Sequence, residues 1–255
     1  MTSEQKTSLA RFLDVAGDYL DGGYARPRET YAFTADAGEG PPANAPQTVQ
    51  EAPGSVFPPE SDTLEGVAAD VRSCGACGLA GTRTNAVPGE GAERPLVMVV
   101  GEGPGQDEDH TGRPFVGKAG QLLDKMLASI GLYREKNCFI ANVVKCRPPE
   151  NRDPLPEETL ACAAFLRRQI HCLMPRVILC VGRVAANSLL GNSDPVGIGN
   201  LRGRFYEYHV DPAENNAIPL LATYHPSALL WHEELKRPAW EDLKLLRSKL
   251  GPDET

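Results

Sequence analysis

The chain has 255 residues, which is enough for one main domain with a substantial core plus an appendage. It contains no run of roughly 18 apolar residues, as a membrane span requires, and its first residues lack the basic and apolar segments of a secretory signal. These absences predict a cytoplasmic protein with no membrane partner. The net charge of −8 is uneven, because residues 1–65 hold four Lys/Arg against eleven Asp/Glu and the remainder is nearly neutral. Whole-chain charge therefore does not exclude nucleic acid as a partner.

Residues 1–63 form a predicted N-terminal extension. Residues 34–63 hold six prolines among Gly, Ala and acidic residues, a composition that predicts a disordered linker. Apolar residues at helical spacing predict a short amphipathic helix over residues 3–20: Leu9, Phe12, Leu13, Ala16 and Leu20. Such a helix suits either packing on the domain or docking of a protein partner. The folded domain is predicted to span residues 64–255.

Strands and helices alternate through the predicted domain. Buried strands are predicted from apolar, β-branched runs, and helices from apolar residues at helical spacing. The strands are expected at 95–100, 138–144, 176–182, 203–210 and 217–225, and the helices at about 117–131, 156–173, 184–191 and 238–250. This alternation predicts an α/β fold with a parallel sheet covered on both faces.

The first predicted strand runs into a glycine-rich loop over residues 101–120, which a helix follows. This order places the loop at the carboxyl edge of the sheet, where α/β folds bind ligands. Gly101 and Gly103 allow a ligand to approach the backbone closely. The loop is acidic, through Glu102 and Glu108 among others, and lacks both the P-loop ending and the dinucleotide spacing. A tight turn with a solvated acidic rim is the alternative interpretation.

Four of the seven cysteines form two pairs that are distant in the sequence. Cys74 and Cys77 precede the first strand, while Cys146 and Cys162 follow the second strand. Four thiolates in this order could hold a zinc ion or a four-iron, four-sulfur cluster. The other three cysteines lie in apolar contexts, where cysteine acts as a small buried hydrophobic residue: Cys138, Cys172 and Cys180.

Four ordered motifs, together with the four paired cysteines, closely resemble the family 4 uracil-DNA glycosylases. The motifs are GEGPGQDED, GRPFVGKAG, NVVKCRPPENR and HPSALL, and the resemblance covers roughly residues 64–250. It implies a three-layer α/β/α fold around a mostly parallel four-stranded sheet. It further implies one four-iron, four-sulfur cluster on the paired cysteines and hydrolytic excision of uracil from single- or double-stranded DNA, as in base excision repair. We expect a monomer.

The resemblance also assigns roles to individual residues. Gly101 and Gly103 belong to the substrate-binding loop, and Phe115 matches the aromatic residue that stacks on the flipped base. Asn142 matches the residue that reads uracil through its amide, which can pair with O4 and N3–H together. His225 matches the donor to uracil O2, where negative charge develops as the base leaves.

The water-positioning residue is less well defined by the motifs. Many superfamily members have an aspartate where this chain has Gly103, so another group must replace it. Glu102 and Glu108 match acidic positions of the family, and Asn151 matches a proposed water contact. We expect Glu102 or Glu108 to position the water and to stabilise the cationic sugar.

The segment that begins with HPSALL matches the loop that enters the minor groove. Leu229 or Leu230 is the candidate wedge that fills the space of the flipped base, and Ser227 is a candidate phosphate contact. Trp231 follows the two leucines, at a position where the resemblance implies a basic residue.

Two other classes of function use the same features. An iron–sulfur redox sensor or DNA-binding module without glycosylase activity would use the cysteines but would not need Phe115, Asn142 and His225. A non-catalytic module could recruit a repair partner through the N-terminal extension. Within the enzyme class, related proteins act on deaminated purines or form covalent DNA adducts, but no insertion of the adduct-forming kind is present.

Overall fold

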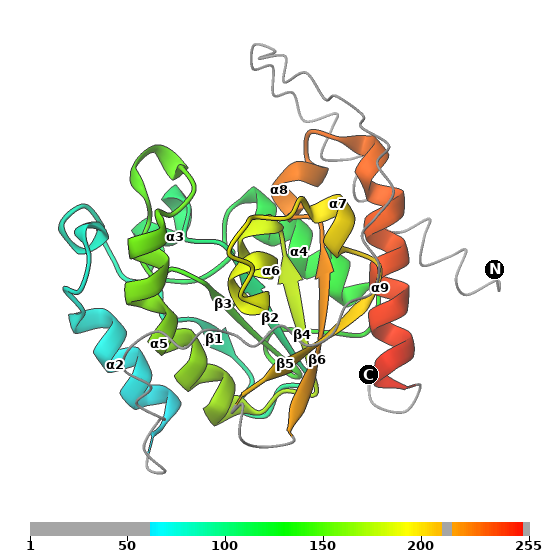
Figure 1. Cartoon of the computed structure of the whole chain (residues 1–255), viewed down its shortest axis with the longest axis horizontal. Coiled ribbons are helices and arrows are strands. Elements are labelled where there is room, and N and C mark those ends of the chain that lie inside the picture. The colour runs from blue at the N-terminus through cyan, green and yellow to red at the C-terminus, as the bar shows by residue number, and fades with distance from the viewer. Residues whose placement is uncertain (1–61, 211–215, 252–255) are drawn as a thin grey trace.

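The computed structural model describes residues 62–210 and 216–251 (Figure 1). The predicted helix over residues 3–20 and nearly all of the predicted linker lie outside the described residues. Helix α2 (Leu64–Ser73) begins where the sequence predicts the folded domain to start, and the Thr63 side chain caps it by accepting from the Gly66 amide at 3.1 Å. Just before this cap, the Asp62 carboxylate accepts from Nε and Nη2 of Arg168 at 2.6 and 2.8 Å.

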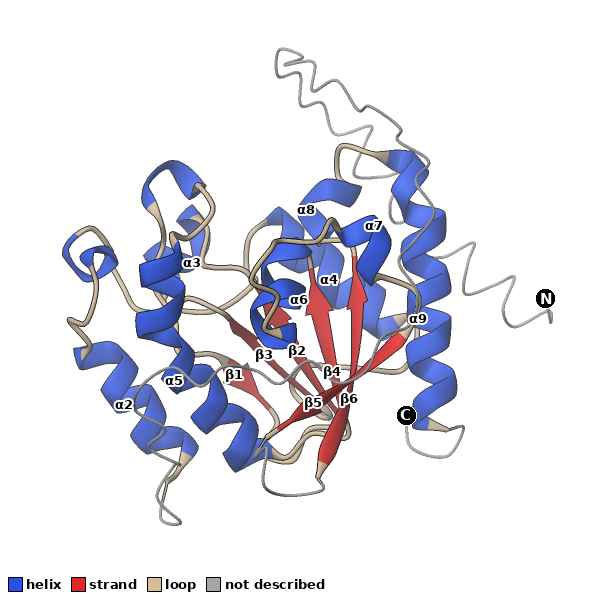
Figure 2. Ribbon diagram, viewed as in Figure 1, coloured by secondary structure: helices blue, strands red, loops and turns tan. Residues whose placement is uncertain are grey.

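The sheet has six strands in the order β1-β3-β2-β4-β6-β5 (Figure 2). The four central strands run parallel, and a short antiparallel strand extends each edge. The sheet therefore has two strands more than the resemblance implies, although its mostly parallel character is as predicted. The strands are β1 (Glu90–Gly91), β2 (Val97–Gly101), β3 (Cys138–Asn142), β4 (Val177–Val181), β5 (Phe205–His209) and β6 (Ala217–Thr223).

Helices cover both faces of the sheet, which confirms the predicted α/β/α layers. Strand β2 is buried throughout and alternates between the two cores, as a central strand must. Val97 and Val99 pack in the core that α4 and α9 cover, whereas Met98 and Val100 pack in the core that α5 and α6 cover. The longer helices are α4 (Lys118–Ala128), α5 (Pro156–Leu173), α6 (Arg183–Leu190) and α9 (Lys236–Leu250).

Short helical turns complete the described part of the chain. They are α3 (Gln106–Thr111), α7 (Ile198–Leu201) and α8 (Pro226–Leu229), with the 3-10 turns η1 (Gly78–Gly81), η2 (Pro149–Asn151) and η3 (Glu233–Leu235). Several of them follow the carboxyl ends of the parallel strands, where the loops lie at one edge of the sheet. Among the described residues, no helix has the length and apolar character needed to cross a bilayer.

Candidate active site

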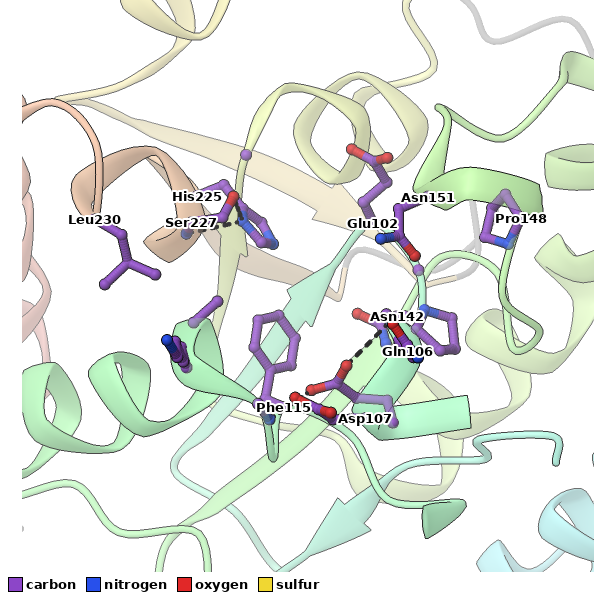
Figure 3. A pocket seen from close by; sticks show the side chains of 18 of the residues that line it. Glu102, Gln106, Asp107, Phe115, Asn142, Pro148, Asn151, His225, Ser227 and Leu230 are labelled. Carbon is purple, nitrogen blue, oxygen red and sulfur yellow. Dashed lines mark hydrogen bonds between the residues drawn. The ribbon is translucent and has the colours of Figure 1, made fainter. Parts of the chain in front are cut away.

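A large cavity opens at the carboxyl ends of the parallel strands (Figure 3). Its volume is about 940 Å³, which is enough for a nucleoside and part of its surroundings. The loops after β2, β3, β4 and β6 all contribute side chains to its wall. Three of the predicted substrate and catalytic residues, Phe115, Asn142 and His225, face this one space.

Asn142 ends β3 with its side chain in the cavity. It is 1% exposed, and its Oδ1 atom has no hydrogen-bond partner among the described residues. A buried carbonyl oxygen without a donor is costly, so it indicates a position where a ligand N–H binds. Gly101 pairs with Asn142 in the sheet register, and a Cβ atom there would lie 2.5 Å from both Asn142 Oδ1 and Phe115 Cζ. The predicted role of Gly101 thus has a steric reason, because a side chain would displace both neighbours.

Phe115 adopts a left-handed backbone conformation with φ of 51°, which is unusual for an aromatic residue. The buried Arg134 holds this conformation by donating to Pro114 O at 3.0 Å and to Phe115 O at 2.8 Å. The same guanidinium pairs with Glu90 on β1 and with Asp124 on α4. Arg134 therefore fixes the aromatic ring in the cavity wall.

Glu108 holds the same loop from its other side. Its Oε1 atom accepts from the backbone N–H groups of Val116 and Gly117 at 2.8 and 2.9 Å, and its Oε2 atom accepts from Gly105 N at 3.1 Å. These three charge-assisted bonds occupy the carboxylate, which leaves it little capacity to orient a water molecule. Glu108 thus holds the backbone next to Phe115.

His225 caps α8 and lies beside Phe115, with ring centroids 5.7 Å apart. Its Nδ1 atom accepts from the Ser227 amide at 3.2 Å, and the Ser227 hydroxyl lies 2.7 Å from the same nitrogen. With Nδ1 as an acceptor, the ring proton resides on Nε2, where it can be donated to a ligand oxygen. Burial lowers the pKa of His225 to about 4, so the ring is neutral at physiological pH.

Glu102 lines the cavity opposite His225 (Figure 3). Burial and, to a smaller extent, the nearby Asp153 carboxylate raise the pKa of Glu102, the Arg183 guanidinium lowers it, and the result is a pKa of about 7. Arg183 forms an ion pair with Asp153 and also lines the cavity. A carboxylate with such a pKa can change its charge near neutral pH.

Asn151 and Gly103 complete the loop side of the cavity. Asn151 has a left-handed conformation with φ of 56° and accepts from Arg147 Nε at 2.7 Å. Gly103 lies against the loop after β3, since a Cβ atom there would be 2.8 Å from Val144 Cγ2. Both residues line the cavity, as predicted for substrate or water contacts.

The segment predicted to enter DNA has its side chains in different environments. Leu229 is completely buried in the core and does not line the cavity, whereas the partly buried Leu230 does. Ser227 is exposed at the cavity and can reach a ligand. Of the two candidate wedge residues, only Leu230 is therefore near the cavity.

The four paired cysteines line a second, smaller cavity between α2, η1 and α5. All four are free thiols. The sulfur of Cys146 accepts a hydrogen bond from Arg83 Nη1 at 3.1 Å, and the sulfur of Cys162 accepts one from Lys145 N at 3.3 Å. The described residues contain no group of three or more His, Cys, Asp or Glu side chains placed to hold a metal ion. Thiolates are the ligands of both structural zinc ions and iron–sulfur clusters. The four thiols and the two N–H donors therefore suit either a zinc ion or an iron–sulfur cluster.

Lys145 connects the two cavities. It is 1% exposed, and its ammonium donates to the backbone carbonyl of Asn142 at 2.8 Å and to Gln169 Oε1 at 2.6 Å. Gln169 in turn donates to Pro88 O at 2.7 Å. Both of these acceptors are neutral oxygens, and Lys145 itself lines the cysteine cavity. A buried cation is costly unless it is fully hydrogen-bonded or paired.

Sequence reasoning missed the residues that hold the site together. Arg134 bonds to Phe115 across 19 positions, and Arg183 pairs with Asp153 across 30. The Lys145 side chain instead folds back onto the end of its own strand. None of these contacts leaves a periodic signal in the sequence. Lys145 and Arg183 each stand next to a predicted strand, within or beside a motif, which is the signal that could have drawn attention to them.

Two comparisons relate the chain to known proteins. A family model described as the uracil DNA glycosylase superfamily matches residues 88–244, which include every residue of the large cavity. A type-4 uracil-DNA glycosylase of Archaeoglobus fulgidus is 42% identical over 192 residues, which are 74% of this chain and 94% of that protein. A type-4 enzyme of Thermotoga maritima is 43% identical over 189 residues, covering 73% and 94%. A type-5 uracil-DNA glycosylase of Pyrobaculum aerophilum is 32% identical over 157 residues, covering 56% and 66%.

Replacing Glu108 by Ala should free the loop that carries Phe115, because three backbone N–H groups lose their acceptor. We expect the Val116 and Gly117 amides to exchange with solvent at least about tenfold faster, the equivalent of one charge-assisted bond. Hydrogen exchange followed by NMR measures this, with the amides of β2 as an internal reference. Asp107→Ala is the matched control, since that carboxylate accepts from none of the three amides. Unchanged exchange in Glu108→Ala would contradict the assigned role.

Proposed function

The chain belongs to the type-4 uracil-DNA glycosylases of the uracil-DNA glycosylase superfamily, and we propose that it hydrolyses the N-glycosidic bond of deoxyuridine flipped out of DNA. The membership confirms the family that the motifs predict. The reaction leaves an abasic site, which is the first product of base excision repair. The observation that carries the proposal is the unpaired Asn142 Oδ1, buried beside Phe115 in the cavity that His225 also faces.

Recognition of uracil rests on three side chains in this proposal. Phe115 stacks on the flipped base, while the Asn142 amide accepts from N3–H through Oδ1 and donates to O4 through Nδ2. Cytosine presents an acceptor at N3 and a donor at C4, so it meets this amide with the wrong polarity. The position of Asn142 supports the selectivity, because the side chain is buried at the end of β3 with the Gly101 backbone and Phe115 packed closely against it.

Bond cleavage places opposite charges at the two ends of the breaking bond. The bond between N1 and C1′ breaks, uracil leaves with the electron pair, and the sugar becomes cationic until water adds to C1′. The neutral His225 donates its Nε2–H to uracil O2 and stabilises the leaving anion. Glu102 faces the cavity as a partly ionised carboxylate, and we assign it the water and the cationic sugar. Asn151 is a second water contact in this assignment.

We propose that Cys74, Cys77, Cys146 and Cys162 hold one four-iron, four-sulfur cluster. Support comes from the cavity that the four thiols line and from the N–H donors of Arg83 and Lys145 that face two of the sulfurs. When bound, the cluster supplies a covalent link between the segment before β2 and the loop after β3. Uracil excision is hydrolysis and requires no electron transfer, so this role is structural.

The remaining partners follow from the reaction. DNA is the substrate in single- or double-stranded form, with Ser227 and Leu230 at the cavity as contacts. We further propose a monomer that works in the cytoplasm, with residues 1–63 as an extension available to a protein partner. A redox or DNA-binding module without catalysis is not favoured, since it would give no use to Phe115, Asn142 and His225.

Uracil excision by the purified protein is the direct test of the function. A labelled oligonucleotide with one deoxyuridine is incubated with enzyme, and alkali then cleaves each abasic site. Because His225 provides the donor to the leaving anion, His225→Ala should slow the single-turnover rate about 10²- to 10³-fold. His209→Ala, an exposed histidine at the far end of β5, is the matched control and should retain the rate. No uracil-dependent cleavage by cluster-loaded wild-type protein would refute the function.

The pH dependence of the single-turnover rate reports on Glu102. The carboxylate is the active form, and the pKa of Glu102 is about 7, so the rate should rise with pH up to about 8 and fall close to tenfold per unit well below 7. His225 stays neutral through this range and adds no second limb. Glu102→Gln should lower the rate and remove the pH dependence between 6 and 8. A wild-type profile that Glu102→Gln reproduces in shape would exclude Glu102 as the titrating group.

Lys145→Met tests whether the buried ammonium supports the cluster. The substitution keeps the length of the side chain but removes its charge and its bonds to Asn142 and Gln169. We expect iron and acid-labile sulfide to fall below one cluster per chain, and uracil excision to slow as Asn142 loses its anchor. Lys125→Met, an exposed position on α4, should retain the cluster. Full iron content together with a higher thermal stability would instead show that the buried charge of Lys145 destabilises the fold and does not support the cluster.

A further inference from the structure

The exposed Trp231 lies at the rim of the active-site cavity, directly after α8. It is 56% exposed, which makes it the most exposed aromatic side chain among the large hydrophobic residues of the described chain. It lines the cavity together with Leu230 and Ser227. Because more than half of the indole is exposed, it contributes little to the core, and its place in the cavity wall puts it within reach of a substrate.

The backbone fixes the position of this indole relative to the catalytic histidine. Trp231 N donates to Ala228 O at 3.2 Å, and the next amide, His232 N, donates to the same carbonyl at 2.9 Å. Ala228 belongs to α8, whose N-cap is His225. The backbone of Trp231 is therefore hydrogen-bonded to the short helix that His225 caps.

The neighbouring side chains determine what the indole can contact. Leu229 is completely buried in the core, so it cannot reach DNA unless the core opens. Leu230 is partly buried against the same core. Beyond Trp231, the exposed Glu233 and Glu234 carboxylates lie 3.7 Å from Lys236 Nζ and 3.2 Å from His232 Nδ1. Trp231 is therefore the side chain of this segment that can present a large apolar face to a nucleobase.

We propose that Trp231 stacks on the nucleobase that flanks the flipped deoxyuridine and so takes the place of the base that has left the stack. This inference rests on the proposed glycosylase function, because it needs a nucleotide in the cavity. Aromatic side chains stack on any base, since every base has a π-face. An indole covers more of a base pair than a leucine side chain does, and it reaches DNA without exposing the core.

The two tryptophans of the chain permit a direct measurement. Trp240 is 3% exposed in the core, so a change of emission on DNA binding reports on Trp231. The probe is a dye-labelled duplex with one 2′-fluoro-deoxyuridine opposite guanine, whose glycosidic bond resists cleavage because fluorine destabilises the cationic sugar. Emission of the wild-type protein should fall on saturation with this duplex, while dye anisotropy measures the dissociation constant independently.

Variants then separate stacking from other roles of the segment. Trp231→Ala should raise the dissociation constant about tenfold or more and abolish the emission change, whereas Trp231→Phe should recover most of the affinity by retaining an aromatic ring. Tyr133→Ala removes another exposed aromatic side chain, at 43% exposure and outside the cavity, and should bind as the wild type does.

Several outcomes would overturn the proposal. They are an unchanged wild-type emission at a duplex concentration where anisotropy shows saturation, an emission change that persists in Trp231→Ala, and a wild-type affinity in Trp231→Ala. Failure of the proposed function gives a different result: binding and quenching of the fluorinated duplex, with no uracil released from ordinary deoxyuridine. Absence of any duplex binding by the wild type would overturn both.

Discussion

The five-residue segment from Asn142 to Cys146 contributes side chains to both cavities. The first residue carries the amide that faces the substrate cavity, and the last carries a thiol of the cysteine cavity. Between them, Lys145 donates through its backbone N–H to Cys162 and through its ammonium to the carbonyl of Asn142. Because the ammonium is buried, it could replace these hydrogen-bond partners with water only by moving out through the core. The two cavities are therefore connected by a few covalent bonds of this segment and by one hydrogen bond.

On the opposite side of the substrate cavity, two charged side chains rather than a strand hold the loop that carries Phe115. Phe115 occupies a left-handed conformation that costs roughly 1–3 kcal/mol for such a residue. Glu108 and Arg134 together form five hydrogen bonds to the backbone of this loop, and bonds to charged groups contribute about 1.5–3 kcal/mol each. Even with desolvation of both ions set against them, these bonds exceed the strain. The aromatic ring is thus preorganised in a conformation that the chain alone would not favour.

This division explains which parts of the structure could be predicted from the sequence. The parallel strands follow from apolar runs, and Asn142 and His225 follow from motifs at strand ends, because both signals are local. β1 could not be predicted, since two residues leave no period. The burial of Leu229 depends on the packing of α8 against α4. The hydrogen bond from Arg134 to Phe115 joins residues 19 positions apart through a backbone carbonyl, a group that every residue possesses. Only the three-dimensional arrangement reveals such contacts.

The same arrangement accounts for the charges in the cavity. Burial makes His225 neutral, and its Nδ1 acceptor role directs the remaining proton toward the cavity, so the donor needs no positive charge of its own. A cationic imidazole would also attract Glu102 and repel the cationic sugar. In the proposed reaction, a neutral donor at the base and a partly ionised carboxylate at the sugar match the charges that develop as the bond breaks. Arg183, paired with Asp153, limits the rise in the Glu102 pKa and so preserves a useful fraction of the carboxylate at neutral pH.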